Sequence, residues 1–91
     1  MELVRAHAFI SGIVQGVGYR FTTQDVALQL GVRGWVRNLP DGSVEAVFEG
    51  PEESVKEMIR WCHQGPRGAV VHEVSVQYEA PEGLKRFEIR R

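Results

Sequence analysis

The residues most able to do chemistry lie in one glycine-rich string from Gly12 to Arg20. The string reads Gly-Ile-Val-Gln-Gly-Val-Gly-Tyr-Arg. Glycines allow backbone amides to converge on an anion, and at a helix N-terminus the helix dipole also favours negative charge. The Arg20 guanidinium can add two parallel hydrogen bonds to phosphate oxygens. The string therefore predicts a phosphate site in a loop that leads from a strand into a helix.

Two commoner glycine motifs do not fit this string. No Lys-Ser or Lys-Thr pair closes a Walker loop, and Phe21 occupies the third glycine position of a dinucleotide fingerprint that starts at Gly16. ATP and NAD are therefore poor candidates for the ligand. Glycine spacing alone is also compatible with a flexible connection that carries a solvated arginine.

Other reactive side chains carry weaker signals. His7, His63 and His72 lack the spacing of metal ligands, so we interpret them as scattered surface histidines and expect neither a metal nor another cofactor. Cys62 is the only cysteine, which excludes an intrachain disulfide. It lies on an apolar helical stripe, so we expect a small buried hydrophobe and not a nucleophile.

Hydrophobic periodicity predicts the elements that must position the glycine-rich string. Alternation with period two indicates strands, and apolar residues at helical spacing indicate helices. We expect strands over residues 3–11, 32–38, 43–49 and 70–79, and a short final strand carrying Phe87 and Ile89. The first helix should end at Gly31, and its apolar stripe is Tyr19, Thr23, Val26, Ala27 and Leu30. The second helix should have Pro51 in its first turn and end at Gly65 and Pro66, and its apolar stripe is Val55, Met58, Ile59 and Cys62.

The order β-α-β-β-α-β, followed by a short C-terminal strand, predicts an α+β fold of the ferredoxin-like class. In this split βαβ sandwich, two helices cover one face of a largely antiparallel sheet. The 91 residues, 43% of them hydrophobic, suit one domain spanning 1–91.

Charge and composition restrict the partners. The net charge of -1 provides no broad positive field for non-specific nucleic-acid binding. A ferredoxin-like RNA-binding module would need stacking aromatics in a basic strand, whereas residues 43–49 are acidic and include only Phe48. No apolar run is long enough for a signal peptide or membrane helix. We expect a cytoplasmic monomer that binds neither nucleic acid nor membrane.

Two segments closely resemble the acylphosphatase family. They are Val-Gln-Gly-Val-Gly-Tyr-Arg at residues 14–20 and Gly-Val-Arg-Gly-Trp-Val-Arg-Asn at residues 31–38, followed by Asp41-Gly42. The resemblance implies metal-free hydrolysis of the carboxyl-phosphate bond of acyl phosphates on a ferredoxin-like fold. It also implies that Arg20 binds phosphate and that Asn38 orients water.

The chemistry of the residues agrees with this resemblance. A carboxylate is a good leaving group, so positioning and charge stabilisation can suffice for catalysis. Asn38 can hold an attacking water in line, while developing charge is received by Arg20 and by the phosphate-binding amides of Gln15, Gly16, Val17, Gly18, Tyr19 and Arg20. We expect an acyl phosphate as substrate and inorganic phosphate as product and competitive ligand.

Three alternatives stay open. By residue type alone, Asn38 suits a turn residue ahead of Leu39-Pro40. The same fold could serve as a domain of a larger carbamoyl-transferring protein that handles carbamoyl phosphate, or as a phosphate-binding accessory domain. The end of the chain at Arg91 favours the stand-alone enzyme.

Overall fold

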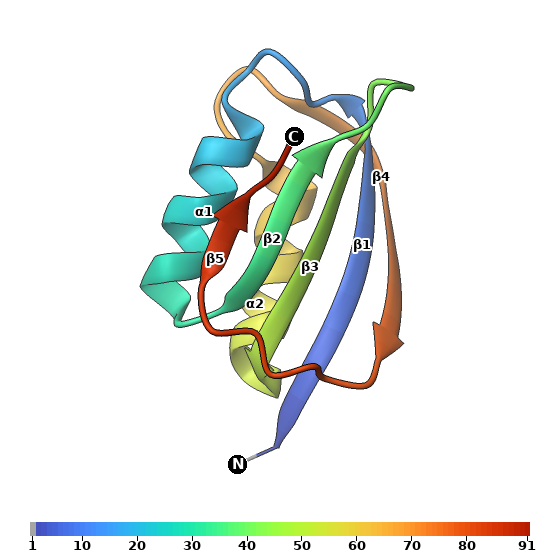
Figure 1. The fold of residues 1–91 in the computed structure, drawn as a ribbon. Helices are drawn as coiled ribbons and strands as arrows, with labels where there is room; N and C mark the ends of the chain where they lie inside the picture. The colour runs from blue at the N-terminus through green and yellow to red at the C-terminus, as the bar shows by residue number, and fades with distance from the viewer. Residues whose placement is uncertain (1) are drawn as a thin grey trace.

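Two helices cover one face of a five-stranded sheet in the computed structural model, which describes residues 2–91 (Figure 1). The two helices have one apolar face each. Burial largely alternates along β1, as the periodicity predicts, whereas the central strand β3 is buried at every position from Val44 to Gly50. The elements are β1 (Leu3–Ile13), α1 (Tyr19–Leu30), β2 (Arg33–Asn38), β3 (Val44–Pro51), α2 (Glu52–Gln64), β4 (Val70–Glu79) and β5 (Phe87–Ile89).

The strand order β4-β1-β3-β2-β5 confirms the predicted split βαβ topology. Strand β3 lies between β1 and β2 and is antiparallel to both, so β1 and β2 run in the same direction. Strand β4 is antiparallel to β1, and β5 adds a parallel edge beside β2. Because β1 and β2 are parallel, the loop after β1 and the last residue of β2 lie at the same end of the sheet (Figure 1).

The core lies between the helices and the covered face of the sheet. In β1, Ala6, Ala8 and Ile10 are fully buried on that face. The buried side chains of the helices match the predicted stripes; they are Tyr19, Thr23 and Ala27 in α1 and Val55, Met58 and Cys62 in α2. Burial raises the pKa of the Cys62 thiol to about 12, so this cysteine is an unreactive packing residue as predicted.

Two predicted boundaries are wrong. Strand β1 does not end before Gly12 but continues to Ile13 through a bulge between Ser11 and Gly12. A Cβ at Gly12 would lie 2.1 Å from the Val70 carbonyl oxygen, so glycine is needed for close strand pairing and does not break the strand. Pro51 is the last residue of β3 and the N-cap of α2, one residue before the first helical turn.

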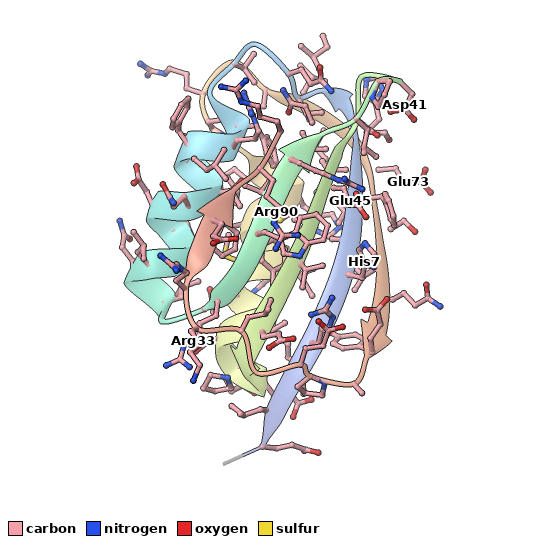
Figure 2. All side chains as sticks on the ribbon, in the orientation of Figure 1. His7, Arg33, Asp41, Glu45, Glu73 and Arg90 are labelled. Atoms are coloured by element: carbon pink, nitrogen blue, oxygen red, sulfur yellow. The ribbon has the colours of Figure 1, made fainter. Side chains whose placement is uncertain are left out.

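The open face of the sheet carries an ion-pair network that includes one of the three histidines. His7 is half-buried and lies 2.6 Å from Glu45 and 3.0 Å from Glu79, one carboxylate at each ring nitrogen. Figure 2 shows His7 and Glu45 on neighbouring strands of this face. His63 and His72 are exposed as predicted, whereas His7 is a half-buried surface residue whose two carboxylate contacts were not predicted.

The pKa of His7 reflects these partners. Burial alone lowers the pKa, but the hydrogen bonds with Glu79 and Glu45 outweigh burial and raise the pKa above its ordinary value near 6.5. Burial alone raises the pKa of Glu45, but the hydrogen bonds with His7 and with Arg37, the latter at 2.6 Å, outweigh burial and lower this pKa. The network therefore links β1, β2, β3 and β4 across the open face of the sheet.

Candidate active site

The loop after β1 is shaped to present backbone amides at the start of α1. Gly16 and Gly18 have φ angles of 77° and 79°, in the left-handed region that favours glycine. Gly18 is the N-cap of α1, and Thr22 donates the first backbone hydrogen bond of the helix to the Gly18 carbonyl, at 3.0 Å. The three amides of residues 19–21 precede that bond and have no acceptor within the helix. They are free to bind an anion.

No acidic side chain opposes an anion in the first turn of α1. The positive end of the helix dipole is therefore not neutralised by its own helix. Val14, fully buried at the beginning of the loop, fixes the loop to the core. These features give the N-terminus of α1 the geometry that an anion site requires, at a position set by packing.

A pocket of about 150 Å³ opens in front of this helix end. Its lining combines the loop, the first turn of α1 and the end of β2; the residues are Val14, Gly16, Gly18, Tyr19, Arg20, Phe21 and Asn38. A space of this size can hold several water-sized groups. The structure thus brings Arg20 and Asn38 to one pocket although they lie on different elements.

Arg20 extends from the first turn of α1 and is partly exposed. Its Nη1 lies 3.4 Å from the Arg90 carbonyl oxygen, to which it donates, and this contact connects the arginine to the C-terminal segment. The Arg90 guanidinium lies over the Trp35 ring, 4.7 Å from its centroid, which positions that segment in turn. Most of the donors of Arg20 remain available to an anion in the pocket.

Asn38 is the last residue of β2, where it pairs with Val44. Its Oδ1 is buried, yet no donor among residues 2–91 forms a hydrogen bond to it. Buried polar atoms are nearly always hydrogen-bonded, and those that are not are common at functional sites. Asn38 also lines the pocket, so this side chain combines a buried acceptor without a partner with a place at the candidate site.

The other loop residues can reach an anion only through their backbone amides. The Tyr19 hydroxyl donates to the Cys62 carbonyl at 2.8 Å, and burial raises the pKa of this phenol far above its ordinary value. Val17 packs against the core. Gln15 is not among the residues that line the pocket, and its side chain bonds instead to the turn between β2 and β3.

Two features of the site have no signal in the sequence. Phe21 lines the pocket while remaining 65% exposed, and one aromatic residue early in a helix does not reveal this position. The Gln15 contact joins residues 24 and 28 positions apart, beyond the reach of local patterns. The Val-Gln-Gly string marks where Gln15 lies but not where its side chain points.

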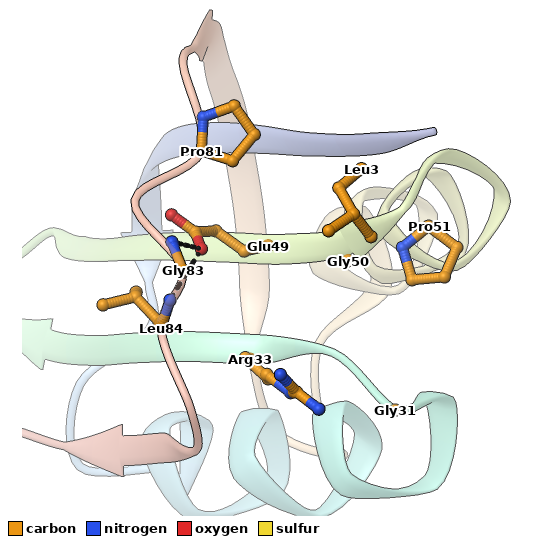
Figure 3. Close-up of a pocket in the computed structure, with 9 residues that line it drawn as sticks. All are labelled: Leu3, Gly31, Arg33, Glu49, Gly50, Pro51, Pro81, Gly83 and Leu84. Carbon is orange, nitrogen blue, oxygen red and sulfur yellow. Dashed lines mark hydrogen bonds between the residues drawn. The ribbon is translucent and has the colours of Figure 1, made fainter. Parts of the chain in front are cut away.

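A larger pocket, of about 380 Å³, lies at the other end of the sheet (Figure 3). It is lined by Leu3, Gly31, Arg33, Glu49, Gly50, Pro51, Pro81, Gly83 and Leu84. The only carboxylate among them, Glu49, already accepts hydrogen bonds from the amides of Gly83 and Leu84 at 3.1 and 3.0 Å. This pocket contains neither free helix-start amides nor Arg20 or Asn38.

Other kinds of site are not formed in the described part of the chain. Across residues 2–91, no three His, Cys, Asp or Glu side chains are grouped so that they could hold a metal ion. No helix in the same range is long and apolar enough to span a membrane.

The fold and the pocket define a small α+β protein with a glycine-rich loop that leads into a helix N-terminus at the edge of a pocket. Comparison with family models places the chain within this class, since the acylphosphatase model matches residues 6–89. The chain belongs to the acylphosphatase family.

Individual relatives agree with this assignment. The chain is 62% identical over 90 residues to a curated acylphosphatase of Trichormus variabilis, with 99% of this chain and 89% of the relative covered. It is similar to the crystal structure of acylphosphatase from Bacillus subtilis, with a TM-score of 0.94, 34% identity and coverage of 97% and 99%. It also matches 12% of full-length HypF in a phosphate- and nucleotide-bound form, with a TM-score of 0.88 and 26% identity over 99% of this chain.

Proposed function

We propose that this chain hydrolyses the carboxyl-phosphate bond of acyl phosphates, with Arg20 and the loop amides binding the phosphoryl group and Asn38 orienting the attacking water. Family membership supports the reaction. The observation that carries the residue roles is that Asn38, whose buried Oδ1 has no hydrogen-bond partner among residues 2–91, lines the same pocket as the first turn of α1.

The bound phosphoryl group makes two kinds of contact in this mechanism. The amides of residues 15–20 and the guanidinium of Arg20 surround its non-bridging oxygens. These donors point to where negative charge is distributed in the transition state, and they need little rearrangement during the reaction. Because the same donors suit a free anion, inorganic phosphate acts as a competitive ligand.

The chemical step needs no acidic side chain. Asn38 Oδ1 accepts a hydrogen bond from the water and directs its oxygen at phosphorus, opposite the acyl oxygen. The new P–O bond forms as the bond to the acyl oxygen breaks, and the electron pair leaves on the carboxylate. The water proton passes to a phosphate oxygen. A carboxylate is a weak base, so its departure requires no general acid.

A second candidate is a phosphate-binding accessory domain without turnover. The match to one region of HypF, which was crystallised with phosphate, favours it. Identity in that match is 26%, against 62% with the acylphosphatase of similar length from Trichormus variabilis. Turnover of a free acyl phosphate is therefore the better supported function.

The domain organisation, location, oligomeric state, cofactors and partners that we propose for the enzyme are based on its composition and family. We propose one domain over residues 1–91, a cytoplasmic monomer, no metal or other cofactor, and no nucleic-acid or membrane partner. The family match over residues 6–89 and the net charge of -1 support these proposals.

The test is a turnover assay on acetyl phosphate after exhaustive chelation, paired with an NMR titration of the same sample with inorganic phosphate. We expect release of acetate and phosphate, and amide shifts concentrated in residues 15–21. Binding with no turnover would select the accessory domain. Activity that is lost on chelation and restored by zinc or magnesium would contradict the metal-free mechanism.

A further inference from the structure

The Gln15 side chain connects the phosphate loop to the turn that follows Asn38. Its Nε2 donates to the carbonyl oxygens of Leu39 and Ser43, each at 2.8 Å. Leu39 directly follows Asn38 at the end of β2, and Ser43 directly precedes the first residue of β3. One amide group therefore uses both of its N–H bonds to bind the two arms of the turn.

The turn does not need these bonds to satisfy its own backbone. The Leu39 carbonyl also accepts from the Gly42 amide at 3.1 Å, and the Ser43 carbonyl accepts from the Leu39 amide at 2.9 Å. Both carbonyls keep a partner when the Gln15 donor is removed, so the turn can form without it. What the Gln15 bonds add is a fixed position of the loop relative to the turn.

That relative position matters because the two parts of the site lie on separate segments. The loop that presents amides to the phosphoryl group contains glycines at φ 77° and 79°, which restrict the backbone little by themselves. Asn38 lies on the sheet, at the end of β2. In-line attack depends on the distance between phosphorus and the water, and a misplacement of about 1 Å can cost on the order of 100-fold in rate.

We propose that Gln15 is a positioning residue that sets the distance between the phosphate loop and Asn38. Its backbone amide contributes to the phosphate site, while its side chain aligns that site with the water held by Asn38. This inference rests on the proposed function. It concerns the rate of the chemical step and not the affinity for phosphate.

The test compares Gln15→Met with Gln24→Met. Methionine retains most of the side-chain length and removes the donor. Gln24 offers a matched control, because its Nε2 donates to the Phe87 carbonyl at 3.0 Å in a similarly half-buried site outside the pocket. For each variant, kcat and KM for acetyl phosphate, the inhibition constant of inorganic phosphate and the urea midpoint of unfolding are measured.

We expect kcat of Gln15→Met to fall on the order of 10- to 100-fold, with phosphate inhibition changed by less than about threefold. Gln24→Met should lower the urea midpoint by a similar amount and keep the wild-type kcat. Gln15→Asn retains the amide on a shorter side chain, so its kcat should lie between those of wild type and Gln15→Met. This variant gives a second measurement of the positioning role if Gln15→Met folds poorly.

Equal kcat for wild type and Gln15→Met would overturn the positioning role and leave the proposed function intact. A loss of kcat in Gln24→Met as large as in Gln15→Met would also overturn it, because general destabilisation would then explain both. A wild-type protein that does not hydrolyse acetyl phosphate would refute the proposed function itself, and the inference with it.

Discussion

Replacement of Asn38 by alanine should not destabilise the protein, although Asn38 lies beside a tight turn. Its buried Oδ1 accepts no hydrogen bond from residues 2–91, so the substitution breaks no bond at that oxygen. Because the mechanism places a water on this oxygen, the substitution removes a water contact and a small side chain but no bond within the described protein. We expect the free energy of unfolding to change by less than about 1 kcal/mol.

The assay is urea unfolding followed by tryptophan fluorescence, with the free energy extrapolated linearly to water. Asp41→Ala in the same turn is the control, because Asp41 Oδ1 accepts from the Ser43 amide at 3.0 Å and from its hydroxyl at 2.6 Å. The control should be less stable than wild type. A loss in Asn38→Ala that exceeds the loss in Asp41→Ala would show that Asn38 is a structural turn residue and would refute the reasoning.

Three further predictions concern other parts of the molecule. Arg20→Lys retains the charge but loses the planar fork, so kcat/KM should fall at least about 10-fold with weaker phosphate inhibition, and a wild-type value would contradict the clamp. The pKa of His7 is raised in the folded state, so protonated His7 stabilises the fold below pH 6.5, and this stabilisation is lost as pH rises through the folded-state pKa. His7→Ala should therefore flatten the fall in urea midpoint above pH 6.5. An unchanged slope would exclude the His7 network as its cause. A Cβ at Gly34 would lie 1.7 Å from the Val47 carbonyl oxygen, whereas one at Gly42 meets nothing within 4 Å. Gly34→Ala should therefore lower the urea midpoint more than Gly42→Ala, and equal losses would contradict the clash.

Features that depend on local patterns could be predicted from the sequence. Alternation in β1 and the stripe in α2 reflect period-two and helical burial, and the structure confirms both. The left-handed glycines at 16 and 18 lie where the sequence indicates a loop before a helix. The proximity of Arg20 and Asn38 follows from the βαβ topology, which places the ends of β1 and β2 at the same end of the sheet.

Features that depend on distant partners could not be predicted in this way. The bulge at Gly12 depends on how closely β4 approaches β1, so a glycine that looks like a strand end lies inside the strand. His7 is surrounded by carboxylates 38 and 72 positions away, one on each neighbouring strand. The Gln15 contact with the turn is equally non-local. Each requires the register between strands, which hydrophobic alternation does not provide.

The most direct test of the account is a steady-state comparison of wild type and Asn38→Ala on acetyl phosphate, with inorganic phosphate as competitive inhibitor. The account predicts that kcat falls on the order of 100-fold or more, because the variant cannot orient water. The inhibition constant of phosphate should change by less than about threefold, since the amides of residues 15–20 and the Arg20 guanidinium are intact. A folded Asn38→Ala protein with near-normal kcat would contradict the mechanism.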